Sequence, residues 1–385
     1  MFRSFITVFL ILLMGSICTI CYGQEIQFSQ YRSFPLYVNP ALTGNIEQQR
    51  ISFVSRNQWV SIKGAFNTVG FSYDVHWKKI KSGLGLIVAQ DETSNGGFST
   101  FTAGGLYSYH IRISRTLYLN SGLRVSFVQQ KLNPDKLTFA DQLIRNDGSA
   151  TYETFGKRTN NFVDFSWGNV LFFSDSSSQA KSYWFGFVLD HLSTPQISFK
   201  DYDGKLPMKF TIHAGAQYRL NQNEIGFPEN VISFSFLYKS QLKWDQAELG
   251  ASFIRRLPHK KRTLVEWKKV QAKFEPSYKQ NFGKISRSEM PMPLVYLEVG
   301  LTYRGLPFIK KYDTGYPNHE AVILLVGFSY YKFMMAYTFD ITISKLKISN
   351  TGGAHELSLV YNFAIPASEK REVKKKAKKR RALFD

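Results

Sequence analysis

Cysteine is nearly absent from this chain of 385 residues: both copies, Cys18 and Cys21, lie within the first 23 residues. If those residues are removed as a signal peptide, the mature chain holds no cysteine, which excludes disulfides and thiolate chemistry. Neither cysteine follows the Leu-Ala/Ser-Gly/Ala pattern of a lipid-attachment site. We therefore expect no lipid anchor.

Long apolar runs are missing as well, since no later stretch approaches the roughly 18 residues that a membrane-spanning helix needs. The run from Phe5 to Met14 follows Arg3 and precedes Cys21-Tyr22-Gly23, a small-x-small cleavage pattern. We predict a signal peptide over residues 1–23 and export from the cytoplasm. A retained anchor is the alternative, but this run is short and is broken by Gly15.

Patterns for catalysis and metal binding are also lacking. The seven histidines form neither a His-x-x-x-His pair nor a carboxylate cluster with metal spacing. The segment Gly83-Leu84-Gly85 lacks the third glycine of a dinucleotide loop. Nothing singles out the nucleophile and base of a Ser-His-Asn phospholipase. We expect no enzyme, no metal and no cofactor.

Aromatic residues are abundant, with 33 Phe and 21 Tyr, and apolar residues recur at every second position. From residue 355 to 363, for example, Leu357, Leu359, Tyr361 and Phe363 alternate with mostly small or polar residues. One face of such a strand is apolar and the other polar, which is typical of strands in an outer-membrane barrel.

The pattern predicts an all-β fold, a transmembrane antiparallel β-barrel of about 14 strands. The predicted strands are residues 50–59, 66–77, 83–91, 98–111, 116–130, 161–174, 182–192, 206–220, 230–240, 245–256, 293–304, 320–330, 332–343 and 353–363. An even count places both termini on the periplasmic side, and closure leaves no unpaired edge. Residues 24–48 become a lead-in or plug segment, 49–363 the barrel and 364–385 a basic periplasmic tail.

Connection lengths test this strand order, because such barrels have short periplasmic turns and longer outer loops. The predicted turns are residues 78–82, 112–115 and 175–181, and the predicted outer loops are residues 131–160, 193–205 and 305–319. Residues 257–292 break the rule as a long periplasmic connection, which holds a basic insert at 257–290.

The net charge of +20 is concentrated in two places. Residues 255–290 carry 11 Lys and Arg against 3 Glu, and residues 366–385 carry 9 against 3 acids. The insert also predicts an amphipathic helix at 264–274. Its candidate partner-binding residues are Lys260, Lys261, Arg262, Trp267, Lys268 and Lys269. Those of the tail are Lys374, Lys375, Lys376, Lys378, Lys379, Arg380 and Arg381.

Both basic segments have a plain alternative, a packed surface helix for the insert and a solvated disordered tail. As docking elements they would bind an acidic periplasmic partner, an anionic lipid surface or the cell wall. Nucleic-acid binding is not expected, because a signal peptide directs the chain out of the cytoplasm.

The lead-in at residues 28–45 precedes the first strand. Pro35 and Pro40 prevent a continuous ladder, and Gly44 permits a tight turn. The segment either plugs the barrel base or contacts a partner directly. In both cases the residues expected to supply polar contacts are Gln30, Tyr31, Tyr37 and Asn39.

Two carboxylates, Asp74 and Asp340, occupy similar settings, SYDV and TFDI, on the polar side of aromatic strands. A buried charge needs a partner. We therefore expect each to bind Arg or Lys inside the lumen, with gating or substrate contact as the alternative.

Several fragments, in this order, resemble the PorP/SprF family of type IX secretion system outer-membrane proteins. They include FSQYRSFPLYVNPALTGN at 28–45, RNQWVSIKG at 56–64, GLGLIVAQD at 83–91 and HELSLVYNF at 355–363. The resemblance implies a fourteen-strand barrel for secretion across the outer membrane and, in gliding relatives, for export or attachment of surface adhesins. The insert and the tail look like additions to the family pattern.

The resemblance further implies a non-enzymatic component of the type IX secretion and gliding machinery. Its partners would be machinery proteins at the periplasmic face, the C-terminal sorting domain of cargo, and outer-membrane lipid. An outer-membrane channel for passive uptake of small solutes is the alternative.

Overall fold

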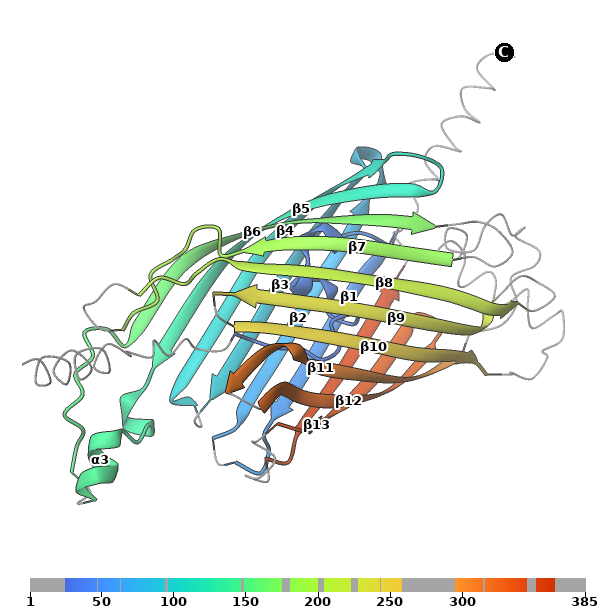
Figure 1. Ribbon diagram of the computed structural model, residues 1–385. Coiled ribbons are helices and arrows are strands. Elements are labelled where there is room, and N and C mark those ends of the chain that lie inside the picture. Colours follow the sequence, from blue (N-terminus) through green and yellow to red (C-terminus); the bar gives the residue numbers. More distant parts are fainter. Residues whose placement is uncertain are drawn as a thin grey trace, which may run out of the picture.

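The computed structural model describes residues 25–46, 48–62, 64–93, 96–146, 149–174, 181–199, 204–222, 228–242, 244–257, 295–313, 316–344 and 351–363. Across this part of the chain, fourteen strands close into one barrel (Figure 1). The strands are β1 (Gln49–Gln58), β2 (Phe66–Trp77), β3 (Ser82–Thr93), β4 (Phe98–Arg112), β5 (Leu117–Leu132), β6 (Thr159–Ser174), β7 (Lys181–Asp190), β8 (Lys209–Gln222), β9 (Pro228–Gln241), β10 (Trp244–Arg256), β11 (Val295–Asp313), β12 (Tyr316–Tyr330), β13 (Phe333–Thr342) and β14 (Ala354–Phe363).

Each strand pairs antiparallel with its neighbours in sequence, and β14 pairs with β1 to close the ring. At this closure Gln49 lies opposite Phe363 and Gln58 opposite Ala354. The predicted all-β fold, an antiparallel barrel of 14 strands, is confirmed.

Side chains alternate between an apolar outer surface and a polar interior. Leu86, Leu123 and Val326 point outward and are 60%, 54% and 53% exposed, whereas Ser72 and Glu356 point inward and are at most 1% exposed. This inverts the pattern of a water-soluble protein and suits a barrel surrounded by lipid. Within the described residues, no helix is long and apolar enough to cross a membrane.

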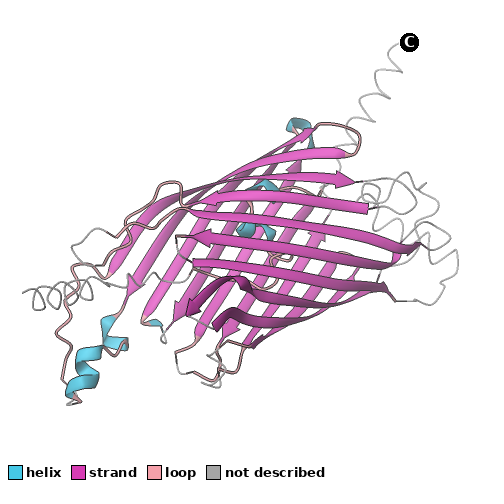
Figure 2. Ribbon diagram, in the orientation of Figure 1, coloured by secondary structure: helices cyan, strands magenta, loops and turns pink. Residues whose placement is uncertain are grey.

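The two ends of the barrel differ. The terminal rim carries the start of β1, the end of β14 and the short turns at 78–81, 113–116 and 331–332. The loop rim, at the opposite end, carries the longer connections 133–158 and 191–208. Connection 133–158 contains η4 (Pro134–Lys136) and helix α3 (Ala140–Arg145), which projects away from the strands in Figure 2.

One predicted outer loop, residues 305–319, is wrong. Strands β11 and β12 run through it as a long hairpin. Gly305 and Pro307 are typical of turns, but the ladder accommodates this stretch through register shifts after Arg304 and after Leu306. Such irregularities absorb residues that break the two-residue alternation, so the sequence pattern did not indicate a strand here.

Residues 25–46, here called the lumenal segment, lie inside the ring of strands, where Figure 1 draws them in blue. The segment includes α2 (Pro35–Val38) and η1 (Pro40–Leu42), and Asn39 between them caps η1 by accepting a hydrogen bond from Ala41 N at 2.9 Å. Its apolar contacts form a small core of Phe28, Phe34 and Leu36 with Val54, Ile87 and Leu106 of the barrel wall.

The lumenal segment runs the length of the lumen. Glu25 contacts Lys209, the first residue of β8, at the loop rim. Gly44 packs against Gly83, the second residue of β3, near the terminal rim. From Glu25 onward, the chain therefore starts near the loop rim, crosses to the terminal rim and only then begins β1. The first described residue thus lies at the rim opposite the end of β14, whereas the even strand count predicted both chain ends on one side.

Candidate functional site in the barrel lumen

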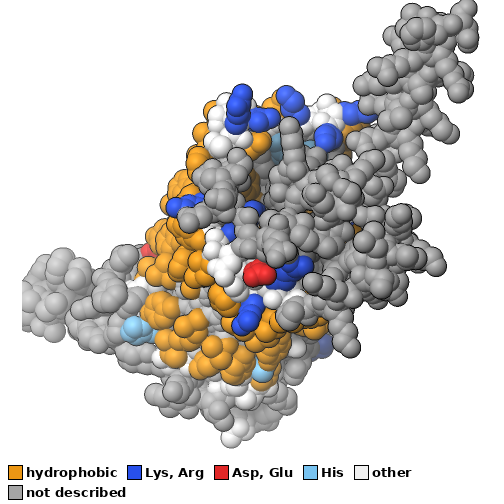
Figure 3. All heavy atoms as spheres, turned by 90° about the vertical axis from the view of Figure 1, so that its right-hand side faces the viewer, with side chains coloured by type: hydrophobic (Ala, Val, Ile, Leu, Met, Phe, Trp, Pro, Cys, Tyr) orange, Lys and Arg blue, Asp and Glu red, His pale blue; other side chains and the backbone are white. Residues whose placement is uncertain are grey.

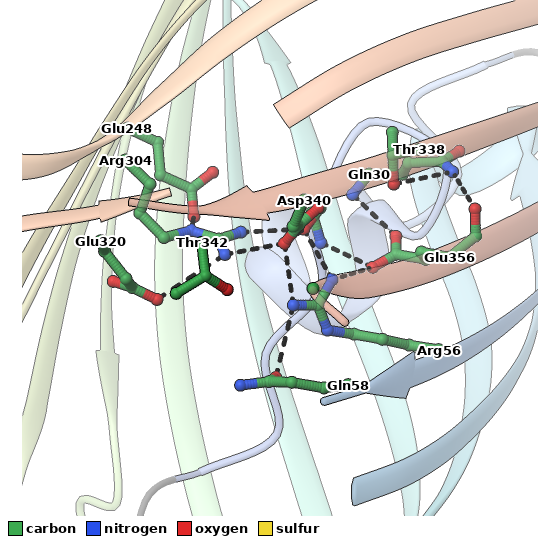
Figure 4. Close-up of polar contacts among 12 residues, drawn as sticks. Gln30, Arg56, Gln58, Glu248, Arg304, Glu320, Thr338, Asp340, Thr342 and Glu356 are labelled. Atoms are coloured by element: carbon green, nitrogen blue, oxygen red, sulfur yellow. Dashed lines mark hydrogen bonds and ion pairs between the residues drawn. The ribbon is translucent and has the colours of Figure 1, made fainter. Parts of the chain in front are cut away.

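Five charged side chains form an ion-pair network inside the lumen, nearer the loop-rim ends of β1, β13 and β14, shown in Figure 4. Each comes from a different strand, and each is at most 3% exposed. This central network consists of Arg56 of β1, Glu248 of β10, Arg304 of β11, Asp340 of β13 and Glu356 of β14.

Asp340 bridges the two guanidinium groups of the network. Its Oδ2 lies 2.9 Å from Arg56 Nη2 and 3.0 Å from Arg304 Nη1. Glu248 accepts from Arg304 Nε at 2.9 Å. Glu356 lies 3.2 Å from Arg56 Nη1. Burying such charges is costly unless every group is paired, so the network ties five strands to one geometry.

The lumenal segment supplies donors that the network lacks, because two guanidinium groups face three carboxylates. The backbone N–H groups of Ser29 and Gln30 both donate to Glu356, each at 2.7 Å. The Ser29 hydroxyl donates to Asp340 at 2.7 Å and accepts from both arginines, at 2.7 and 2.9 Å. The segment is thus held by charge-assisted hydrogen bonds, which are stronger than neutral ones.

A second ion pair holds the segment near the terminal rim. Asp74 accepts from Arg50 Nε at 2.8 Å and from the Gly44 backbone N–H at 2.7 Å. Nearby, the ring nitrogens of His76 and His110 lie 2.9 and 3.0 Å from carbonyl oxygens of the segment. The expectation that Asp74 and Asp340 bind arginine inside the lumen is confirmed.

A row of small residues receives the segment between these two anchors. Gly83, Ser108, Gly122 and Gly168 lie opposite one another on β3, β4, β5 and β6, and we call them the small-residue groove. A Cβ atom on Gly122 would lie 2.4 Å from Pro40 C and from the next backbone nitrogen. Real Cβ contacts are longer than this. The backbone of the segment can therefore lie against β5 only because residue 122 is glycine and has no side chain.

The N-terminal end of the segment is held at the loop rim. Glu25 contacts both His191 and Lys209, and Lys209 lies 3.3 Å from Asp190. On its other side, His191 Nδ1 lies 2.9 Å from Asp164. Burial alone would lower the pKa of His191, but the carboxylates of Glu25 and Asp164 outweigh it and raise that pKa to about 9.

This pKa predicts a pH-dependent hold on Glu25. A histidine whose folded pKa is raised stabilises the folded arrangement fully below its unfolded value, roughly 6.5, and the effect is lost as pH rises through the folded value. We expect a spin label at Gln27→Cys to be immobile at about pH 6 and more mobile at about pH 10.

The variant H191Q tests this assignment, because it removes the charge while keeping a polar side chain. In H191Q the spin label at position 27 should be mobile at both pH values. In H355Q, which alters a histidine bound to Tyr337, the mobility of the label should depend on pH as it does in the wild type. A transition that persists unchanged in H191Q would contradict the assignment.

The structure places the four candidate residues of the lead-in inside the barrel. Gln30 and Asn39 are 3% and 0% exposed. Gln30 Nε2 donates to the backbone of β13 and β14, and Asn39 Nδ2 donates to Asn169 O at 3.2 Å. The Tyr37 hydroxyl donates to Ile26 O at 3.1 Å.

The fourth of these residues, Tyr31, is hydrogen-bonded to Ser235 of β9. All four thus face the barrel wall or the segment itself. The candidate residues of the basic insert and of the tail lie outside the described residues. In the described ranges, no group of three His, Cys, Asp or Glu side chains could hold a metal.

Sequence reasoning missed most of the residues that hold the segment. Four of them are charged residues at inward-facing positions of strands: Arg56, Glu248, Arg304 and Glu356. A charged residue in the inward-facing row of a strand was the signal that could have identified them. Gly122 carried no such signal, because its role depends on the alignment of four strands.

One protein family matches most of the chain. A family model described as type IX secretion system membrane protein PorP/SprF matches residues 20–361. Among curated proteins, no relative matches the chain. Similar solved structures include the CymD monoaromatic hydrocarbon channel, at 8% identity and a TM-score of 0.41, covering 86% of this chain and 93% of that one.

Two further solved structures are equally distant in sequence. The P. putida toluene transporter TodX is 9% identical, with a TM-score of 0.39, covering 85% of this chain and 93% of that one. BamA from Haemophilus ducreyi, lacking POTRA domains 1–3, is 8% identical, with a TM-score of 0.37, covering 82% and 70%. Because the family model covers most of its length, this chain belongs to the PorP/SprF family of type IX secretion system membrane proteins.

Proposed function

We propose that this protein is a plugged barrel of the outer membrane that serves type IX secretion as a non-enzymatic docking component. The observation that carries the proposal is the lumenal segment, which is bonded to the wall at the loop rim, at the central network and near the terminal rim. Because its own chain occupies the lumen, we expect the protein to act through its surfaces.

The orientation follows from the general rule that such barrels have short turns on the periplasmic side. By this rule the terminal rim faces the periplasm. Residues 1–23 act as the signal peptide that directs export. The ends of the basic insert meet on this rim, since the Leu257 N–H donates to Val295 O at 2.9 Å. The tail leaves from the same rim, after Phe363. Both basic segments thus start where periplasmic machinery or a cargo sorting domain would bind.

The passive solute channel is the competing function. It needs a continuous aqueous path, and the lumenal segment, in which Phe34, Leu36 and Asn39 are each 0% exposed, narrows any such path. A wide path would require the segment to move out. The family membership also favours secretion over solute uptake.

Two measurements on the full-length protein test the proposal. In planar bilayers we expect the wild type to show no steady open level. In cells, a photo-crosslinker at Lys79 in the terminal rim should capture secretion machinery or cargo, whereas one at Lys205 in the loop rim should not. Steady conductance together with no capture from the terminal rim would favour the channel.

A further inference from the structure

The charge of the terminal rim is strongly one-sided. We count the turns and the two strand residues that adjoin each of them, leaving aside Arg50, which is paired with Asp74. Only one described carboxylate, Glu229, lies in this set. The cations, here called the cationic rim, are Lys78, Lys79, Lys81, Arg112, Arg115, Lys181, Arg255, Arg256 and Lys332.

The loop rim, counted in the same way, is balanced. Its described cations are Lys131, Lys136, Arg145, Lys157, Arg158, Lys205 and Lys209. Its described acids are Glu92, Asp135, Asp141, Glu153, Asp190 and Asp245. The basic character of the protein is therefore built into one end of the barrel, independently of the insert and the tail.

The cationic rim is accessible. Lys79, Lys81, Arg112 and Arg115 are all exposed. Figure 3, which views the molecule from the terminal-rim side, shows blue side chains spread over this face with little red between them. Clustered like charges repel one another and raise the local concentration of an oppositely charged ligand.

The geometry separates two anionic partners, lipid headgroups and an acidic polypeptide. Lipid surrounds the outer perimeter, where Lys181 and Arg255 continue the outward-facing rows of β7 and β10. Arg112, by contrast, belongs to the inward-facing row of β4, where it follows Ser108 and His110. Arg256 likewise belongs to the inward-facing row of β10. Together with the turn lysines, these cations border the mouth of the barrel, which a polypeptide crossing the mouth can reach.

We propose that the cationic rim binds an acidic polypeptide segment of a periplasmic partner across the mouth of the barrel. This rests on the proposed docking function and names the chemistry of its partner. The contact is close to the lumenal segment, because Lys81 O accepts from the His110 N–H at 2.8 Å and His110 in turn contacts Thr43 O at 3.0 Å.

The test uses the full-length protein in nanodiscs of zwitterionic lipid and a fluorescent oligoglutamate peptide as probe. We expect wild-type binding at low salt, detected by anisotropy, that disappears at about 0.5 M salt because the charges are screened. Reversing Lys78, Lys79 and Lys81 to Glu should weaken binding at least about tenfold. The matched control reverses Lys131, Lys157 and Lys205 on the loop rim and should bind as wild type does.

Equal binding by the two triple variants, or no binding by the wild type, would overturn the proposal. Native mass spectrometry covers the lipid alternative. The wild type could retain anionic phospholipid that the terminal-rim variant loses, while both bind the peptide equally. That result would also overturn the proposal, in favour of a lipid site. Failure here leaves the cellular crosslinking test intact, since a partner can dock on this rim without an acidic segment.

Discussion

Replacing Gly122 with leucine is expected to expel the lumenal segment from the small-residue groove and open the barrel. The new Cβ would lie 2.4 Å from Ala41 N and from Pro40 C, which are backbone atoms and cannot rotate away as a side chain could. In planar bilayers the G122L variant should show steady openings that the wild type lacks.

The barrel itself should survive this substitution. Gly122 points into the lumen, and its strand partners Ser108 and Gly168 keep their backbone ladder. Leucine is also better suited to a strand than glycine is, because glycine weakens a strand interior. An unchanged shift in gel mobility on heating would show that the wall is intact, and cleavage of residues 25–46 by added protease would show that the segment is out.

Gly105 provides a matched control on the neighbouring strand β4. A Cβ there would meet nothing within 4 Å, so G105L makes the same chemical change without touching the segment. It should remain closed and protected from protease. A G122L barrel that is as closed and as resistant to protease as G105L would show that the groove does not hold the segment.

The barrel was predictable because the sequence of each strand indicates which of its side chains face outward. In β14, Leu357, Leu359 and Tyr361 alternate with polar or small residues, and this local pattern fixes which side faces lipid. The pairing of Asp340 was predictable for the same reason, since a carboxylate on the polar face of a spanning strand needs a cation.

The position of the lumenal segment could not be read in this way. Its groove exists only where Gly83, Gly122 and Gly168 come into register across separate strands, and no local pattern encodes that register. Ser29 gave no signal either, because its hydroxyl gains its role from Arg56 and Arg304, which are distant in sequence. The strands 293–304 and 320–330 were predicted, but their continuation as β11 and β12 into residues 305–319 was missed because the sequence there does not alternate.

Replacing Arg304 with methionine is expected to be the most destabilising single change in the central network. Arg304 is 1% exposed and is the cation bound by Glu248, which is also 1% exposed. Methionine fills much of the same space but takes from that carboxylate the guanidinium to which it is bonded, and breaking a buried pair in this way costs about 3–5 kcal/mol. The barrel should lose its compact gel mobility at a clearly lower temperature.

The effect of R304M arises from charge more than from shape, and two further variants separate the causes. In the double variant R304M/E248Q the orphaned carboxylate becomes neutral, so part of the lost stability should return, a coupling that a double-mutant cycle measures. R158M breaks the exposed pair with Asp135, whose side chains are 68% and 75% exposed, and should change stability by less than about 0.5 kcal/mol. If R304M and R158M unfold at the same temperature, the central network contributes no more than a surface pair, and the lumenal segment must be held by its packing and by its anchors at the two rims.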